Sequence, residues 1–237
     1  MVEVGGRPIL WHIMKLYAHH GLREFVLCLG YKGHVIKDFF LNYEAMTRDF
    51  TVCLGRREAL EFHDSHPEDG WRVTLAETGL SAQTGARIHR AARHVDADSA
   101  FCATYGDGLG DIDVGRLLAF HHDHGKLGTI TGVRPPGRFG ELRVKNGRAL
   151  AFDEKPQVSG GLINGGFFVF ERAFVERYLS DDDQVVLERE PLQRLAADGQ
   201  LMVWQHDGFW QPMDTYREWR LLEDLWNSGR APWKVWE

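Results

Sequence analysis

The chain has 237 residues, of which 43% are hydrophobic and 26% are charged. This length and apolar content suffice for a substantial core and do not fit a disordered chain. The formal net charge of -6 argues against nucleic acid or an anionic membrane surface as the main partner, so bound phosphate would need a local site.

Cysteine usage and hydropathy indicate a cytoplasmic protein. Cys28, Cys53 and Cys102 are odd in number, widely separated and set in apolar runs, which favours reduced thiols over disulfides or a zinc site. No apolar stretch approaches the roughly 20 residues that span a bilayer. Residues 1–8 do not read as a signal peptide, so we expect no membrane association.

Helical patterns followed by buried strands dominate the first part of the chain. Residues 8–20 place apolar side chains at helical spacing between Pro8 and Gly21, and residues 24–30 form a short apolar run closed by glycine. The same order recurs in residues 86–94 and 99–105, and again in 114–124 and 128–133. A helix followed by a buried strand is typical of an α/β sheet.

The second part of the chain mixes hairpins and helices. Residues 142–144 and 149–152 flank Asn146-Gly147, a turn dipeptide that tolerates positive φ, and predict a hairpin. The further predicted elements are a strand at 167–170, a helix from Glu190 to Gly199 and a strand at 201–205. Without internal repeats or a linker, residues 1–237 are predicted to form a single domain.

Two residue types could suggest binding sites but have simpler explanations. The histidine runs 19–20 and 121–124 lie at predicted helix ends, where they complement the helix dipole, and they lack metal-ligand spacing. Six of the eight tryptophans lie from Trp204 onward. We favour packing over a nucleobase-stacking surface for Trp219, Trp226, Trp233 and Trp236.

Two acidic residues are candidate magnesium ligands. Asp107 lies between Gly106 and Gly108 at the end of a buried strand, where ligands bind in open α/β sheets, although the same residues also make ordinary turns. Asp214 follows an aromatic run and precedes a predicted helix, which it could instead cap. Mg²⁺ commonly takes one or two protein carboxylates and leaves its other positions to phosphates and water.

Two further segments suit a phosphorylated sugar. Lys155 offers a charge for a phosphate and Glu154 an acceptor for sugar hydroxyls, although the two could form a solvated ion pair. Asn164 precedes Gly165 and Gly166, and its amide both donates and accepts while the glycines admit a ligand, although a glycine turn explains them equally well.

The order of the motifs resembles the sugar-phosphate nucleotidylyltransferase family along the whole chain. The matching blocks are residues 105–108, 135–140, 154–156, 163–169 and 209–215. The resemblance implies a Rossmann-like mixed, mostly parallel sheet flanked by helices, with a β-hairpin-rich sugar-binding part. It also implies that the family's first strand and glycine-rich triphosphate loop are absent before Met1.

The resemblance also assigns roles to individual residues. Asp107 and Asp214 match the Mg²⁺ ligands, which makes them catalytic together with Lys155 on the sugar phosphate. Positions implied to contact or border the sugar are Glu154, Asn164, Gly140, Tyr105 and Trp210. Positions implied to lie near the nucleotide are Gly85, Arg87 and Gly106.

The substrates implied are CTP and glucose 1-phosphate. Residues 2–14, 28–33 and 231–234 most resemble family members that make CDP-glucose and pyrophosphate from them. Such members are homo-oligomers that supply deoxysugars for cell-surface polysaccharide, including lipopolysaccharide O-antigen. UTP or dTTP as the nucleotide, and a non-catalytic sugar-phosphate-binding or subunit protein, stay open as alternatives.

The missing first strand has a structural consequence that the fold can test. Because this strand lies centrally in the family's sheet, its absence should leave unpaired backbone groups on its neighbours beside an open apolar face. Either the translation start was placed too late, or the chain is a shortened product with impaired activity.

Overall fold

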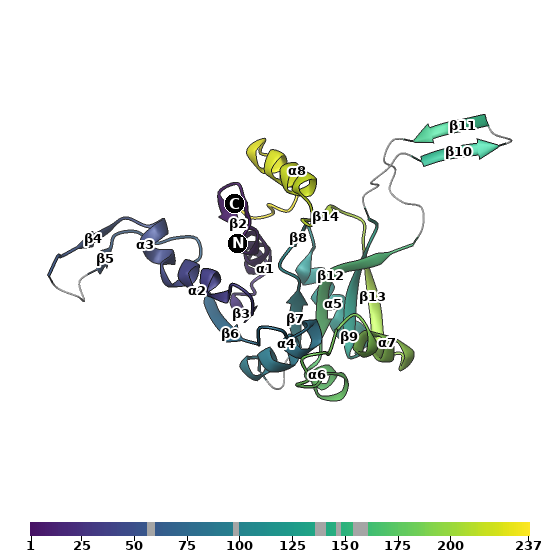
Figure 1. The fold of residues 1–237 in the computed structure, drawn as a ribbon, viewed down its shortest axis with the longest axis horizontal. Helices are drawn as coiled ribbons and strands as arrows, with labels where there is room; N and C mark the ends of the chain where they lie inside the picture. Colours follow the sequence, from purple (N-terminus) through teal and green to yellow (C-terminus); the bar gives the residue numbers. More distant parts are fainter. Residues whose placement is uncertain (56–59, 97–99, 136–140, 146–147, 154–160) are drawn as a thin grey trace.

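A computed structural model describes residues 1–55, 60–96, 100–135, 141–145, 148–153 and 161–237. Its largest sheet has the strand order β13-β9-β12-β7 (Figure 1). These strands are β7 (Phe101–Thr104), β9 (Gly128–Val133), β12 (Ile163–Phe170) and β13 (Leu201–His206). Helices α5 (Val114–His124), α6 (Arg172–Tyr178) and α7 (Glu190–Ala197) pack around this sheet.

A second, parallel pair of strands lies toward the N-terminal half. It consists of β3 (Glu24–Leu29) and β6 (Arg72–Glu77), with α1 (Ile9–His19), α4 (Thr84–Ala91) and a 3-10 turn (Ala92–His94) beside it. The predicted elements from α1 to β9 are thus confirmed to within three residues at each end. Strand β6 and the helices α2 (Gly33–Leu41) and α3 (Tyr43–Thr47) were not predicted.

One detail of the predicted sheet is wrong. The pairs β3–β6 and β9–β13 are parallel, but β12 runs antiparallel to both β7 and β9. The sheet is therefore mixed rather than mostly parallel. Between β9 and β12 the described residues form an antiparallel hairpin and no helix, so this connection differs from the helical crossover that joins parallel strands.

Among the described strands, β3 pairs only with β6, and β7 pairs only with β12. Residues of β3 and β7, together with apolar residues of α1, line a cavity of about 830 Å³ that also includes Arg87 and Asp107. The cavity thus lies between strand edges that are unpaired among the described strands. We call this cavity the seam between β3 and β7.

Two antiparallel hairpins project from opposite ends of the molecule (Figure 1). One is β4 (Phe50–Val52) with β5 (Leu60–Phe62), and the other is the predicted β10 (Glu141–Lys145) with β11 (Arg148–Asp153). Short strand pairs complete the fold: β1 (Glu3–Val4) with β2 (Arg7–Pro8), and β8 (Gly108–Gly110) with β14 (Trp210–Pro212), followed by α8 (Tyr216–Asn227).

The tryptophans of the C-terminal region pack, as predicted. Trp233 is fully buried, and Trp226 and Trp236 pack against the same core cluster beneath α1. The indole of Trp219 donates a hydrogen bond to the Glu3 carbonyl at 2.7 Å. These contacts fasten α8 onto the N-terminal strands.

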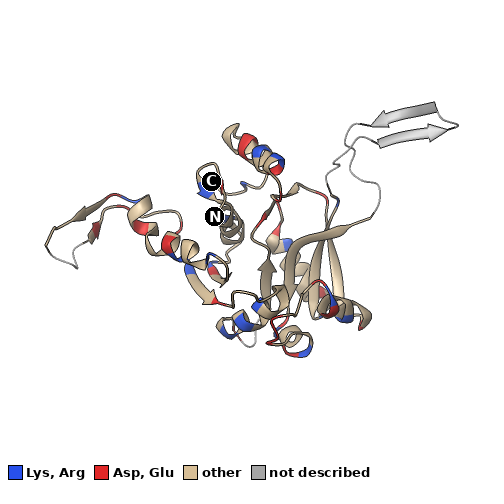
Figure 2. Ribbon diagram, viewed as in Figure 1, with Lys and Arg blue, Asp and Glu red and all other residues tan. Residues whose placement is uncertain are grey.

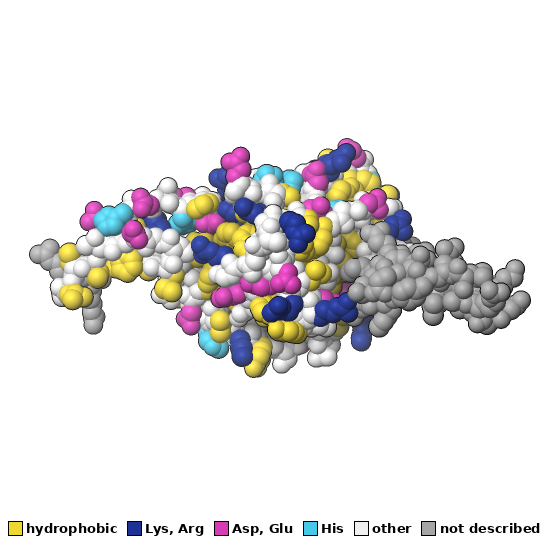
Figure 3. Space-filling view, turned by 90° about the horizontal axis from the view of Figure 1, so that it is seen from above, with side chains coloured by type: hydrophobic (Ala, Val, Ile, Leu, Met, Phe, Trp, Pro, Cys, Tyr) yellow, Lys and Arg dark blue, Asp and Glu magenta, His cyan; other side chains and the backbone are white. Residues whose placement is uncertain are grey.

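Charged residues lie mostly outside the largest sheet. Figure 2 shows Lys, Arg, Asp and Glu mostly on helices and loops, while the strands of the largest sheet carry few. On the face shown in Figure 3, acidic and basic side chains are interspersed rather than separated by sign. The three cysteines are free thiols, and no helix among the described residues is long and apolar enough to cross a membrane.

Candidate active site

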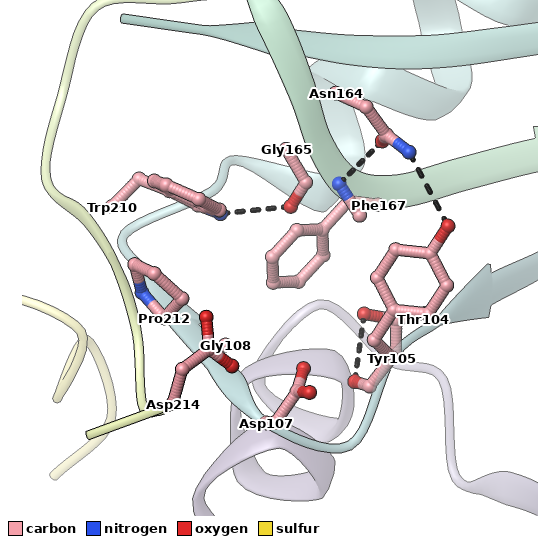
Figure 4. A pocket seen from close by; sticks show the side chains of 11 residues that line it. Thr104, Tyr105, Asp107, Gly108, Asn164, Gly165, Phe167, Trp210, Pro212 and Asp214 are labelled. Atoms are coloured by element: carbon pink, nitrogen blue, oxygen red, sulfur yellow. Dashed lines mark hydrogen bonds between the residues drawn. The ribbon is translucent and has the colours of Figure 1, made fainter. Parts of the chain in front are cut away.

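Strand pairing brings the two candidate metal ligands together. Asp107 precedes β8, Asp214 follows β14, and these strands pair antiparallel with Gly108 opposite Pro212. The backbone N–H of Met213 donates to the Asp107 carbonyl at 2.8 Å. Both carboxylates point into one pocket of about 190 Å³ (Figure 4).

The electrostatics of this carboxylate pair favour a bound cation. Burial raises the pKa of Asp107, and the nearby Asp214 carboxylate raises it further. Two negative charges that are close and partly shielded from water repel each other unless a positive charge lies between them. Two carboxylates at a pocket wall are also the hard oxygen donors that Mg²⁺ prefers.

Three predicted sugar-pocket residues line the same pocket as the carboxylates. The Asn164 side-chain oxygen accepts from the Gly166 N–H at 2.8 Å, and its NH₂ donates to the Tyr105 hydroxyl at 3.3 Å. The Trp210 indole donates to the Gly165 carbonyl at 2.8 Å. These bonds fix a polar amide and two aromatic rings around the pocket, a combination suited to a sugar (Figure 4).

Glycines allow the aromatic ring of this pocket to lie against the backbone. Gly166 has φ of +79°, and a Cβ atom there would lie 2.6 Å from the Tyr105 ring. Gly165 similarly faces Val133, where β12 departs from the register of β9. The sequence Asn164-Gly165-Gly166 is therefore required by the shape of the site and is more than a surface turn.

A capping box fixes the backbone just after Asp214. Thr215 is the N-cap of α8, its hydroxyl accepts from the Glu218 N–H at 3.3 Å, and the Glu218 carboxylate accepts from the Thr215 N–H at 2.9 Å. The capping role that the sequence left open for Asp214 thus belongs to Thr215. The Asp214 N–H also donates to Glu218, at 2.9 Å.

Thr215→Ala is expected to destabilise the protein by about 1 kcal/mol, because it removes the cap hydroxyl at α8. Urea unfolding monitored by circular dichroism measures this change. Thr47→Ala, at the end of α3, is the control for loss of a threonine hydroxyl away from the site. Equal stability of Thr215→Ala and the wild type would contradict the capping role.

Sequence reasoning missed Glu188, which joins two parts of the site. Its carboxylate accepts hydrogen bonds from the Tyr105 hydroxyl and, at 2.8 Å, from the Thr84 hydroxyl at the start of α4. Burial and this carboxylate raise the pKa of Tyr105, so the phenol stays protonated and donates. The residue lies between α6 and α7, and no local pattern in the sequence points toward the pocket.

The three residues predicted near the nucleotide have different surroundings. Arg87 lies in the seam between β3 and β7, where its guanidinium donates to the Leu29 carbonyl at 3.0 Å and to the Thr78 hydroxyl at 2.8 Å. The Gly85 N–H already donates to the Val185 carbonyl at 2.9 Å. Gly106 lines the same cavity as Arg87, and a Cβ atom at this position would meet nothing within 4 Å.

Three predicted site residues lie outside the described residues. They are Gly140, Glu154 and Lys155. Strand β11 ends at Asp153, immediately before Glu154. Their roles toward the sugar phosphate stay predictions.

Comparison with known proteins defines the class to which this site belongs. The family model described as nucleotidyl transferase matches residues 1–212. The chain therefore belongs to the nucleotidyl transferase family. Over all 237 residues it is 49% identical to the glucose-1-phosphate cytidylyltransferase of Salmonella typhimurium, covering 91% of that protein.

More distant relatives share the fold and differ in the nucleotide named. The mannose-1-phosphate guanylyltransferase catalytic subunit beta of Dictyostelium discoideum is 27% identical over 90% of this chain and 55% of its own length. The crystal structure of HddC from Yersinia pseudotuberculosis complexed with GMP-PN superposes with a TM-score of 0.68 at 18% identity, covering 95% of this chain and 88% of that chain. The latter likeness establishes an α/β nucleotidyltransferase fold.

Proposed function

We propose that the protein transfers a cytidylyl group from CTP to α-glucose 1-phosphate, giving CDP-glucose and pyrophosphate. The observation that carries the proposal is the convergence of Asp107, Asp214, Tyr105, Asn164 and Trp210 on one pocket. The full-length identity of 49% to a glucose-1-phosphate cytidylyltransferase supports the choice of nucleotide and sugar.

Mg²⁺ is the cofactor that fits the residues present. Asp107 and Asp214 would hold it, since their paired carboxylates leave an unneutralised negative charge at the pocket wall. The ion would supply positive charge next to the phosphates of the nucleotide.

In the proposed reaction, a phosphate oxygen of the sugar phosphate attacks the α-phosphorus of CTP. A P–O bond forms there as the bond to pyrophosphate breaks, and no general base is needed because the attacking oxygen is already anionic. The chain's contribution is placement: Asn164, Tyr105 and Trp210 orient the sugar ring, and Lys155 is proposed to hold its phosphate. Glu188 keeps the Tyr105 ring in position.

Pyrophosphate release with glucose 1-phosphate and each of CTP, UTP, dTTP and GTP tests the proposal. We expect release with CTP to exceed that with the other nucleotides. A preference for UTP or dTTP would reject the cytidylyl assignment while leaving the enzyme class intact. The homo-oligomer and the cytoplasmic location implied by the resemblance stay predictions.

A second candidate is a protein that binds the sugar phosphate without transferring a nucleotide. The seam favours it, because this cavity next to Asp107 is lined largely by apolar side chains, and the Arg87 donors described above already have protein acceptors. Calorimetry with glucose 1-phosphate and with CTP separates the two candidates. Binding of the sugar phosphate alone would favour the binder, and measurable pyrophosphate release would exclude it.

A further inference from the structure

A cluster of metal-ligating side chains lies far from the pocket, near the base of the β4–β5 hairpin. Glu44 comes from α3, and His66 and Asp69 come from the loop between β5 and β6. One ligand atom from each residue lies within 4.8 Å of the other two. The His66 side chain is only 9% exposed, whereas both carboxylates reach solvent.

The spacing of these atoms fits the edge of a zinc coordination sphere. His66 Nε2 lies 3.0 Å from Glu44 Oε1 and 3.4 Å from Asp69 Oδ1. Ligand atoms about 2.0–2.1 Å from a tetrahedral Zn²⁺ are about 3.3 Å from one another. A zinc ion could therefore replace the hydrogen bond between His66 and Glu44 with little movement of either side chain.

The other side of the imidazole ring is already oriented by Glu68. His66 Nδ1 lies 3.3 Å from Glu68 Oε2 and accepts from the Glu68 N–H at 3.1 Å. Metal binding at Nε2 places the ring proton on Nδ1, where the Glu68 carboxylate accepts it and the backbone N–H gives up its acceptor. A carboxylate behind a ligating histidine is the usual arrangement at zinc sites.

The neighbouring cations do not bind the oxygen atoms that face His66, and they leave the cluster with a net negative charge. Arg48 binds Oε2 of Glu44 at 2.6 Å, on the oxygen that does not face His66. Lys15 binds Oε1 of Glu68 at 3.2 Å, on the oxygen turned away from His66. With neutral His66, the carboxylates of Glu44, Glu68 and Asp69 outnumber these two cations.

We propose that Glu44, His66 and Asp69 bind Zn²⁺, with Glu68 as the positioning residue and a water molecule in the fourth position. The nitrogen ligand favours zinc over Mg²⁺, which takes oxygen ligands. Because its ligands come from α3 and from the loop before β6, the ion would hold the base of the β4–β5 hairpin against the rest of the protein.

Isothermal titration of the full chain with Zn²⁺ tests this site, using protein that carries Asp107→Asn and Asp214→Asn to remove the other carboxylate pair. We expect one equivalent of zinc to bind, His66→Gln to weaken binding at least 10-fold, and Glu68→Gln to weaken it about 10- to 100-fold. His63→Gln is the matched control, since His63 is an exposed histidine just after β5 and its side chain bonds only to the Thr51 hydroxyl among the contacts described.

Circular dichroism of each variant checks that it is folded, and Glu44→Gln, at a partly exposed helix position, replaces His66→Gln if the latter unfolds. The proposal would be overturned if the protein bound no zinc, or if the variants at Glu44 and His66 bound zinc as tightly as the protein without these substitutions. Since the Asp107 and Asp214 carboxylates are absent from the titrated protein, neither result bears on the nucleotidyl transfer.

Discussion

Asp107→Asn is expected to lower kcat by about 10²- to 10³-fold, because one of the two carboxylates that would hold the cation is lost. Pyrophosphate release at saturating CTP, glucose 1-phosphate and Mg²⁺ measures the loss. Asp123→Asn, at an exposed position of α5, is the control for removing one negative charge elsewhere. Retention of wild-type kcat by Asp107→Asn would exclude Asp107 as a catalytic residue.

The same substitution should stabilise the metal-free protein at neutral pH. Burial and Asp214 raise the pKa of Asp107 in the folded state, so this carboxyl lowers stability progressively as the pH rises from the ordinary carboxyl pKa to the raised pKa. The stability advantage of Asp107→Asn is therefore full above the raised pKa. It shrinks as the pH falls through the raised pKa and disappears below the ordinary carboxyl pKa.

Thermal unfolding between acidic and neutral pH, with and without Mg²⁺, tests whether Asp107→Asn is more stable than the wild type and how this difference changes with pH. Added Mg²⁺ should raise the Tm of the wild type and leave that of Asp107→Asn nearly unchanged. A wild type that is more stable than the variant at neutral pH without metal would show that the two carboxylates do not repel each other.

Gly166→Ala is expected to weaken binding of glucose 1-phosphate by at least 10-fold. The new methyl group would collide with the Tyr105 ring at 2.6 Å and displace the ring from the pocket wall. The positive φ of +79° adds about 1–2 kcal/mol of backbone strain in the folded protein. Calorimetric titration with the sugar phosphate measures the change in Kd.

Gly161→Ala separates the collision from the strain. Gly161 has a similar φ of +78°, but a Cβ atom there would meet nothing within 4 Å. Gly161→Ala should therefore lower the stability of the protein without weakening its binding of glucose 1-phosphate. Equal effects of the two substitutions on Kd would mean that the position of Tyr105 does not control sugar binding.

Local sequence patterns were best at predicting the bounds of an element when one of its sides is apolar and its ends carry turn residues. Helix α1 has both signals, Pro8 before it and Gly21 after it, and was predicted within one residue at each end. Helix α2 has neither signal, because its N-cap residue is Lys32, which has a left-handed conformation and makes no side-chain capping bond, and so the helix was missed. Element boundaries thus follow from the sequence only where capping and turn chemistry mark them.

Some site residues could likewise be identified from the sequence, and others could not. The glycines after Asn164 mark close approaches of the backbone, whereas those beside Asp107 leave room for a Cβ atom. Both Asp107 and Asn164 were identified from the sequence. Glu188 was not, because its role comes from contacts with Tyr105 and Thr84, each more than 80 positions away. Such tertiary contacts leave no periodic or spacing signal in a single sequence.

The seam between β3 and β7 divides the protein into parts of unequal cooperativity. On one side, four strands share a continuous hydrogen-bonded ladder, whereas among the described strands β3 and β6 pair only with each other. A two-stranded ribbon has little stability of its own, so it can open without unfolding of the larger sheet. Amide protons of β3 should then exchange with solvent faster than those of β9 and β12.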